Sequence, residues 1–162
     1  MSFVDDINTL VKDLEGVTTK VITDSTLRQI GKETVRDIRT RTRFSEVVAK
    51  FGGDVSPIAP LKPSTIRARS DDSDYLSSDT KPSTSNLTRS GNMLSAVSFS
   101  YNKNSVTIYI KGKFNAEIAS YHMSGTPNMV KRPFFNLSKF QISRIENLTL
   151  AALDDYFRKT FL

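Results

Sequence analysis

The chain has 162 residues, among them no Cys, no Trp and one His, and its 23 Lys and Arg residues against 17 Asp and Glu residues give a net charge of +6. This length predicts a single domain, residues 1–162, with a core large enough to fold without disulfides. The lack of Cys excludes a disulfide framework, a thiolate zinc site, an iron–sulfur cluster and a cysteine nucleophile. No apolar run approaches the roughly 18–20 residues that span a bilayer, so no membrane partner is expected.

Five basic residues recur at helical spacing in the first third of the chain. Steps of four, four, three and four residues place them in one stripe on a straight helix. They are Arg28, Lys32, Arg36, Arg39 and Arg43. Two interpretations stand: a contact for phosphates or for an acidic partner subunit, and a solvated helix face, which is the commoner role of a charge run. No aromatic residue interleaves with the stripe, so a base-stacking platform is not predicted.

The N-terminal region predicts two helices. Residues 3–14 have apolar side chains at helical spacing and predict a short amphipathic helix within an N-terminal arm, residues 1–20. A longer helix is predicted from Thr23 or Asp24, both good N-cap residues, to about Lys50, before a pair of glycines. The inward positions of this helix are Leu27, Ile30, Thr34, Val35 and Ile38.

A proline-containing and then strongly polar region follows. The prolines within residues 54–63 predict an extended or turn-like stretch, because a prolyl nitrogen donates no hydrogen bond. Ser64 is then expected to cap a short helix over residues 65–69. Residues 70–86 predict a long mobile loop, because they cannot bury enough apolar surface to offset the entropy of ordering. The candidate docking residues in this loop are Asp71, Asp72, Asp74 and Tyr75.

After this loop the apolar residues recur with a period of two. They alternate with polar residues over residues 97–101 and again over 106–110, and residues 102–104 between the two runs predict a turn. The pattern is that of a β-hairpin with one apolar face. Gly112 is expected to end the hairpin. Residues 115–122 predict a helical turn, or a strand leading into one, which Gly125 ends.

The C-terminal region, residues 138–161, predicts a long helix. Ser138 and Gln141 have the spacing of a capping box. The apolar side chains of this helix cover far more than a narrow stripe, which is typical of helices that are deeply buried or used in assembly. Helices on both sides of an antiparallel hairpin, without βαβ alternation, predict an α+β class in which the sheet is built around that hairpin.

The sequence does not predict an enzyme. His122 is the only imidazole, and no nucleophile motif accompanies it, so it is expected to be a structural histidine near a turn. Asp71, Asp72 and Asp74 resemble the start of a calcium loop but lack its central Gly and its final Glu. No phosphate-binding glycine motif is present. No cofactor or metal is expected.

Three segments, in order, resemble the tail-completion or virion morphogenesis proteins of tailed bacteriophages, the neck proteins that join head and tail. PLKPSTI at residues 60–66 is similar to a P-L-x-P-S-T-I run that opens a short helix. LTRSGNMLSAV at residues 87–97 is similar to L-x-x-T/S-G-x-L-x-x-S-I/V ahead of the hairpin. ASYHMSG at residues 119–125, with RPF at 132–134, resembles A-x-x-H-x-x-G followed by R-P-F. The matching residues are Pro60, Leu61, Pro63, Ser64, Gly91, Leu94, His122, Gly125, Arg132, Pro133 and Phe134.

This resemblance implies a structural virion protein that acts in head–tail joining without a chemical step. It implies a homo-oligomeric ring, often of six subunits, in the virion neck between the head connector and the tail tube, assembled in the host cytoplasm. Under this hypothesis the basic stripe contacts a neighbouring subunit or lines the lumen through which DNA passes. A tail terminator that caps the tail tube is the close alternative, and a small basic nucleic-acid-binding module is the alternative from another class.

Overall fold

The computed structural model describes residues 21–44, 59–72, 81–83, 87, 90–103 and 105–161. Several predicted features lie outside these residues: the helix over residues 3–14 in the N-terminal arm, residues 45–50 of the second helix, and Asp74 and Tyr75 of the predicted loop. The described helices are α2 (Asp24–Arg43), α4 (Pro63–Asp71), α5 (Asn92–Ser95), α6 (Lys113–Ser124) and α7 (Lys139–Phe161), and the strands are β1 (Val97–Asn102) and β2 (Ser105–Ile110).

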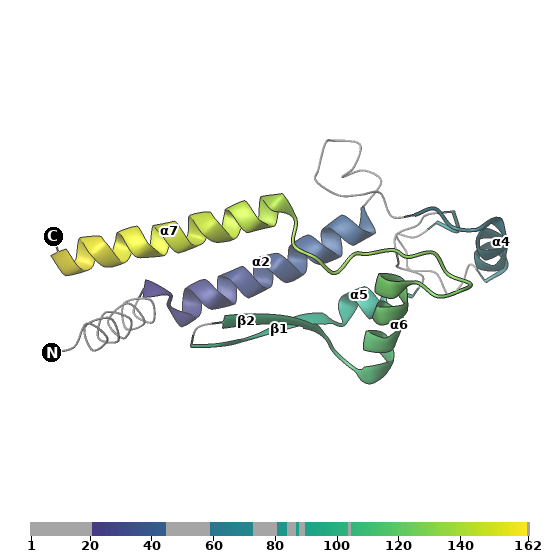
Figure 1. Cartoon of the computed structure of the whole chain (residues 1–162), viewed down its shortest axis with the longest axis horizontal. Helices are drawn as coiled ribbons and strands as arrows, with labels where there is room; N and C mark the ends of the chain where they lie inside the picture. Colours follow the sequence, from purple (N-terminus) through teal and green to yellow (C-terminus); the bar gives the residue numbers. More distant parts are fainter. Residues whose placement is uncertain are drawn as a thin grey trace, which may run out of the picture.

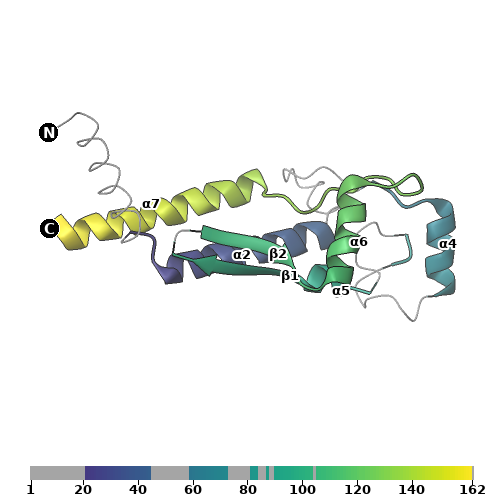
Figure 2. The same ribbon diagram turned by 60° about the horizontal axis from the view of Figure 1, so that its bottom comes forward.

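The fold is α+β, as predicted, and within the described residues its sheet is the β1–β2 hairpin alone. The molecule is elongated (Figure 1). The hairpin covers one side of α2, and α7 lies antiparallel along another side of the same helix (Figures 1 and 2). The short helix α5 and the upright helix α6 follow at one end of the hairpin, and α4 lies beyond them at the end of the molecule. Helix α2 is therefore the element around which the rest is packed.

Helix α2 begins where the sequence predicted. The side chain of Thr23 accepts a hydrogen bond from the backbone N–H of Thr26, which identifies Thr23 as the N-cap. All five predicted inward positions are buried. The predicted end at about Lys50 is wrong, because the helix ends at Arg43 and Phe44 takes a non-helical conformation as the C-cap. The helix ends nine residues before Gly52, the first of the two glycines that were expected to end it, and helical propensity alone does not signal this earlier end.

The predicted hairpin is confirmed, with Val97 opposite Ile110 and Phe99 opposite Ile108, but Asn102 belongs to β1 and pairs with Ser105, so the predicted turn over residues 102–104 begins one residue too early. Its apolar face lies on α2, whereas Ser100, Thr107 and the ring of Tyr109 face outward. The helix approaches this face closely at Gly31, where an added Cβ would lie only 2.2 Å from the ring of Phe99. Glycine is thus required here for the contact between helix and sheet.

The core lies where α2, the hairpin, α5 and α6 meet. Its buried apolar residues are Val35, Ile38, Leu87, Met93, Leu94, Val97, Ala119 and Phe134. Helix α6 resolves the ambiguity left by the sequence: residues 115–122 belong to a helix of 12 residues, and its C-cap is Gly125 at a φ of 78°. Left-handed backbone of this kind favours glycine.

Helix α4 is longer than predicted and begins earlier. Pro63 is its first residue and Lys62 its N-cap, so Ser64 lies inside the helix and does not cap it. Proline suits the first helical position because the N–H that it lacks would have no intrahelical partner there. The helix also includes Ser70 and Asp71, so the start of the predicted loop over residues 70–86 is helical.

Candidate interaction surfaces

The basic stripe of α2 lies beside the outer edge of β1. Arg28, Lys32, Arg36 and Arg39 are exposed, and Arg43 is half-buried. Two of these side chains are held against the hairpin. Arg28 donates a 2.6 Å hydrogen bond to the hydroxyl of Tyr101 and lies over its ring, and this hydrogen bond raises the pKa of Arg28. Arg39 donates to the carbonyls of Ser95 and Val97, at 2.7 Å each.

A groove of about 500 Å³ runs between this stripe and β1. The side chains that line it from α2 are Lys32, Val35, Arg36, Arg39, Thr40 and Arg43, and those from β1 are Val97, Ser98 and Phe99. Four of the described lining residues are cationic and none is a carboxylate. The name α2–β1 groove is used for this feature below. Its positive charge favours an anionic partner.

Arg132 of the third motif segment binds the first motif segment. Its guanidinium donates to the carbonyls of Ala59 and Pro60, each at 3.0 Å, and its backbone N–H donates to the carbonyl of His122 at 2.7 Å. Arg132 is buried, although the carbonyls that surround it carry no net charge. The contact joins residues more than 70 positions apart, so the two motif segments form one structural unit.

His122 lies at a cavity of about 700 Å³ lined from α4, α5 and α6. Burial, and then the charges of Arg132 and Arg69, lower the pKa of His122. Within the described residues the Nδ1 atom of His122 is buried and has no hydrogen-bond partner. No Asp or Glu is among the described residues that line the cavity, and a catalytic imidazole has no carboxylate there to orient it.

The other motif residues act in the architecture. Gly91 precedes α5 at a φ of 72°, Leu94 is 2% exposed, and Phe134 is buried with its ring edge-on to the half-buried Phe135. Leu61 lines the cavity beside His122, whereas Ser64 and Pro133 are exposed. The third segment is further held by the sulfur of Met123, which accepts hydrogen bonds from the backbone N–H groups of Phe134 and Phe135.

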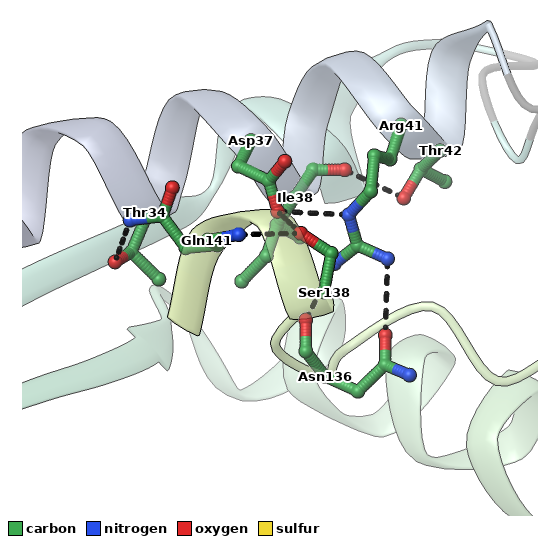
Figure 3. A network of polar contacts seen from close by, with 8 residues as sticks. All are labelled: Thr34, Asp37, Ile38, Arg41, Thr42, Asn136, Ser138 and Gln141. Atoms are coloured by element: carbon green, nitrogen blue, oxygen red, sulfur yellow. Dashed lines mark hydrogen bonds and ion pairs between the residues drawn. The ribbon is translucent and has the colours of Figure 1, made fainter. Parts of the chain in front are cut away.

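A polar network joins α7 to α2 and was only partly visible in the sequence (Figure 3). Gln141 is 1% exposed and donates from Nε2 to the hydroxyl of Thr34 at 3.0 Å. Its backbone N–H donates to the side chain of Ser138, the predicted N-cap, at 3.0 Å. The Gln141 side chain therefore does not turn back to the cap as a full capping box requires. The Ser138 and Gln141 spacing was the one sequence signal for this contact.

Arg41 completes this network and was missed in the sequence. It is buried, and its Nε donates to Asp37 Oδ2 at 2.8 Å while its other nitrogens donate to Asn136 (Figure 3). Arg41 lies three residues after Ile38 and seven after Thr34, so helical spacing places it with the inward positions, and this spacing was the sequence signal that could have found it. Nearer the middle of the two helices, Arg144 forms an ion pair with Glu33 and lowers the pKa of Glu33, chiefly through this hydrogen bond.

Helix α7 exposes much of its apolar surface. Leu150, Phe157 and Phe161 are 61%, 48% and 70% exposed, and within the described residues Gln141 alone is fully buried in this helix. Gln141 lies opposite Thr34, which is ten residues after Asp24, the first residue of α2. Because the helices are antiparallel and α7 continues for 20 residues after Gln141, α7 extends about ten residues, or roughly 15 Å, beyond Asp24. The overhang is visible in Figure 1. The sequence predicted that a helix with so wide an apolar face is either deeply buried or used in assembly. Within the described residues α7 is not deeply buried.

The predicted docking residues are placed in part. Asp71 is the last residue of α4 and Asp72 is its C-cap, both exposed.

In the described part of the chain no group of three or more His, Cys, Asp or Glu residues is placed to hold a metal ion. Among the same residues, no helix has the length and apolar character to cross a membrane.

Comparisons with known proteins found no match to this chain. No protein-family model matches it, no curated protein matches it, and no solved structure matches it.

Proposed function

We propose that the protein is a structural virion protein of a tailed bacteriophage, a tail-completion or neck protein that forms a ring between the head connector and the tail tube and acts in head–tail joining. The observation that carries the proposal is the exposed apolar stripe of α7, defined by Leu150, Phe157 and Phe161. Large apolar side chains gathered on one surface mark an interaction site. The function that they favour is assembly.

The motif segments support the same proposal. The order of the three segments resembles the phage family, and the hydrogen bonds from Arg132 to Ala59 and Pro60 bring the first and third segments into contact. A resemblance over residues that form one packed unit is more specific than one over unrelated loops. A ring also needs two different surfaces that meet, and the α7 stripe and the α2–β1 groove are two such surfaces on separate faces of α2.

The decisive experiment is electron microscopy of particles made when the gene for this chain is disrupted in its phage. Full heads and free tails lying unjoined are the expected products of a missing tail-completion protein. Joined virions of normal appearance contradict the proposal. Abnormally long tails indicate instead a tail terminator, the close alternative.

The nucleic-acid-binding alternative has one favourable observation, the four cations of the α2–β1 groove. It predicts binding of duplex DNA that weakens steeply with salt, with a log–log slope of several units, because phosphate contacts release counterions. A filter-binding titration of the purified protein at two salt concentrations tests it. Weak binding with a slope near zero excludes this alternative.

A further inference from the structure

A cavity with mainly apolar walls is lined from α4, α5 and α6, and the name α4–α6 cavity is used for it below. It is the cavity of about 700 Å³ beside His122, within the range of about 300–1,000 Å³ that is typical of ligand pockets. Phe114 lines it and is 72% exposed, so this ring stands at the mouth of the cavity. The described apolar side chains that line it include Leu61, Ala68, Leu87, Met93, Phe114 and Ile118. A cavity of this size and chemistry fits large apolar side chains.

The last turns of α7 have the pattern of a helix that docks in an apolar groove. Leu150, Leu153, Phe157 and Phe161 follow one another at steps of three, four and four residues, so they lie on one face of the helix. Three of them are exposed, and Leu153 is half-buried. Anchors at such spacing are typical of an amphipathic helix bound in a hydrophobic groove. Residues 150–161 extend over roughly 16 Å of helix and need an apolar counterpart.

The charges of the α7 end are compatible with this cavity. From Leu150 onward the charged side chains of α7 form two ion pairs along the helix, Asp154 with Arg158 and Asp155 with Lys159. The end of α7 therefore carries no net charge, and the cations that line the cavity do not repel it. A basic segment, in contrast, would be repelled there.

The α2–β1 groove is a poorer counterpart for the aromatic rings of α7, because four of its lining residues are cations. The two sites adjoin along the chain, since Ser95 and Ala96 line the α4–α6 cavity and Val97 lines the groove. A neighbouring subunit seated at this junction can contact both. Within one subunit the C-terminal end of α7 and helix α4 lie at opposite ends of the molecule (Figures 1 and 2). The end of α7 can therefore reach only the cavity of another copy.

We propose that the end of α7, residues 150–161, docks in the α4–α6 cavity of a second copy of this chain, with Leu150, Phe157 and Phe161 as its apolar anchors. The two surfaces differ and lie at opposite ends of the subunit, which makes the contact heterologous. A contact of this kind closes into a ring when the rotation between subunits permits it. The inference rests on the proposed function in that a ring supplies the second copy.

Two variants that each lose one of the two surfaces test the contact. Leu150→Glu combined with Phe157→Glu places charges on the α7 stripe, and Thr65→Lys combined with Ala68→Lys places charges in the cavity. All four side chains are exposed, so the charges cost the single subunit little, whereas charges inside an apolar contact are strongly unfavourable. Each variant alone is expected to be monomeric by native mass spectrometry at concentrations at which the wild type assembles.

A mixture of the two variants is expected to associate, because one supplies an intact cavity and the other an intact α7 end. Its dissociation constant is expected to be at least tenfold lower than that for self-association of either variant. The matched control is Ser64→Lys combined with Ser70→Lys, at exposed positions of α4 that are not among the described residues lining the cavity, and it is expected to assemble like the wild type. Assembly of the Thr65/Ala68 variant by itself overturns the proposal, and so does a mixture that does not associate.

His122 locates the contact, because it is the only histidine of the chain and lies at the cavity. The Leu150/Phe157 variant is prepared with isotope-labelled histidine, and unlabelled Thr65/Ala68 variant is added. The C2–H signal of His122 is expected to shift, because aromatic rings enter the cavity beside it. Addition of wild-type protein gives the same measurement if the Thr65/Ala68 variant does not fold. Association that leaves the His122 signal unchanged overturns the cavity as the docking site.

These outcomes are distinct from those that test the proposed function. A ring of wild-type protein together with normal assembly of the Thr65/Ala68 variant overturns this inference alone. Association of the two mixed variants, together with joined virions after disruption of the gene, supports this inference and contradicts the proposed function.

Discussion

Single residues decide how α2 meets its neighbours. Gly31 allows the helix to lie against the ring of Phe99, and the buried Gln141 joins α7 to Thr34. Arg41 replaces the water that it loses on burial with Asp37 and Asn136. None of these three roles follows from residue type, because glycine is usually unfavourable inside a helix and glutamine and arginine are usually exposed.

Replacement of Gly31 by Ala is expected to lower the stability of the protein. The substitution gains about 1 kcal/mol of helix propensity, but overpacking against a ring costs about 1–3 kcal/mol because the hairpin or the ring must move. The free energy of unfolding is therefore expected to fall by about 1 kcal/mol, measured by urea denaturation. In a Phe99→Ala background, which removes the ring and its Cγ, Gly31→Ala is expected to be neutral or stabilising. Equal effects in both backgrounds contradict the steric account.

His122 makes the stability of the protein depend on pH. Burial and the nearby Arg132 and Arg69 lower the pKa of His122 below its usual value in the folded state. The unfolded chain, with a pKa of about 6.5, therefore binds a proton that the folded chain does not as the pH falls. The contribution of neutral His122 is complete above pH of about 6.5 and is lost as the pH falls from there toward the lower folded value.

The measurement is the free energy of unfolding at several pH values between about 7.5 and 5. The wild type is expected to lose stability across this range, and His122→Gln is expected to have a flatter profile because glutamine does not titrate. The difference between the two profiles isolates His122 from the carboxylates, which titrate lower. Parallel profiles contradict the assignment.

At the scale of elements, α7 is attached to α2 at its first turns and is more exposed toward its end. Its attachment includes the Gln141–Thr34 hydrogen bond, the hydrogen bond from the Ser138 hydroxyl to Asp37 and the Arg144–Glu33 ion pair. Arg144 is half exposed, so this ion pair contributes at most about 1 kcal/mol. The buried Gln141 contact is therefore the more important anchor of the helix.

Truncation of one partner in this contact is expected to be costlier than replacement of both. Gln141→Met leaves the buried hydroxyl of Thr34 without its donor, and Thr34→Val leaves the amide unpaired, so each is expected to destabilise by about 1–3 kcal/mol. The double variant is expected to lose clearly less than the sum of the single losses, because neither polar group remains buried and unpaired. Thermal melts of the four proteins complete the cycle, and simple additivity contradicts a direct contact.

At the scale of the whole molecule, the surfaces left uncovered are those expected of an assembling subunit. The α7 overhang exposes its apolar stripe, and the α2–β1 groove gathers cations on another side of α2. In the ring that we propose, neighbouring subunits cover such surfaces without any change of fold.

Substitution of Leu150 and Phe157 by Glu is expected to prevent assembly while the subunit stays folded. Both side chains are already exposed, so charges there cost the monomer little, whereas the same charges in an apolar contact are strongly unfavourable. Light scattering is expected to give a ring for the wild type and a monomer for the double variant. Ala151→Glu, on the same helix but on a different face and also exposed, is expected to assemble normally. Assembly by the Leu150/Phe157 variant contradicts a role of the α7 stripe.

The spacing of apolar and capping residues in the sequence determined the α+β class and the start and buried face of α2. It also determined which face of the hairpin is apolar and which residue caps α7. These depend on spacing and on capping chemistry, which act within a few residues. Only the tertiary structure decided that the buried Arg41 donates to Asn136, which lies 95 residues further along the chain. The same is true of the meeting of Arg132 with Pro60, of Gly31 with Phe99, and of the apolar residues of α7 that stay uncovered. The physical reason is that these contacts join residues far apart in the chain, where periodicity holds no information about partners.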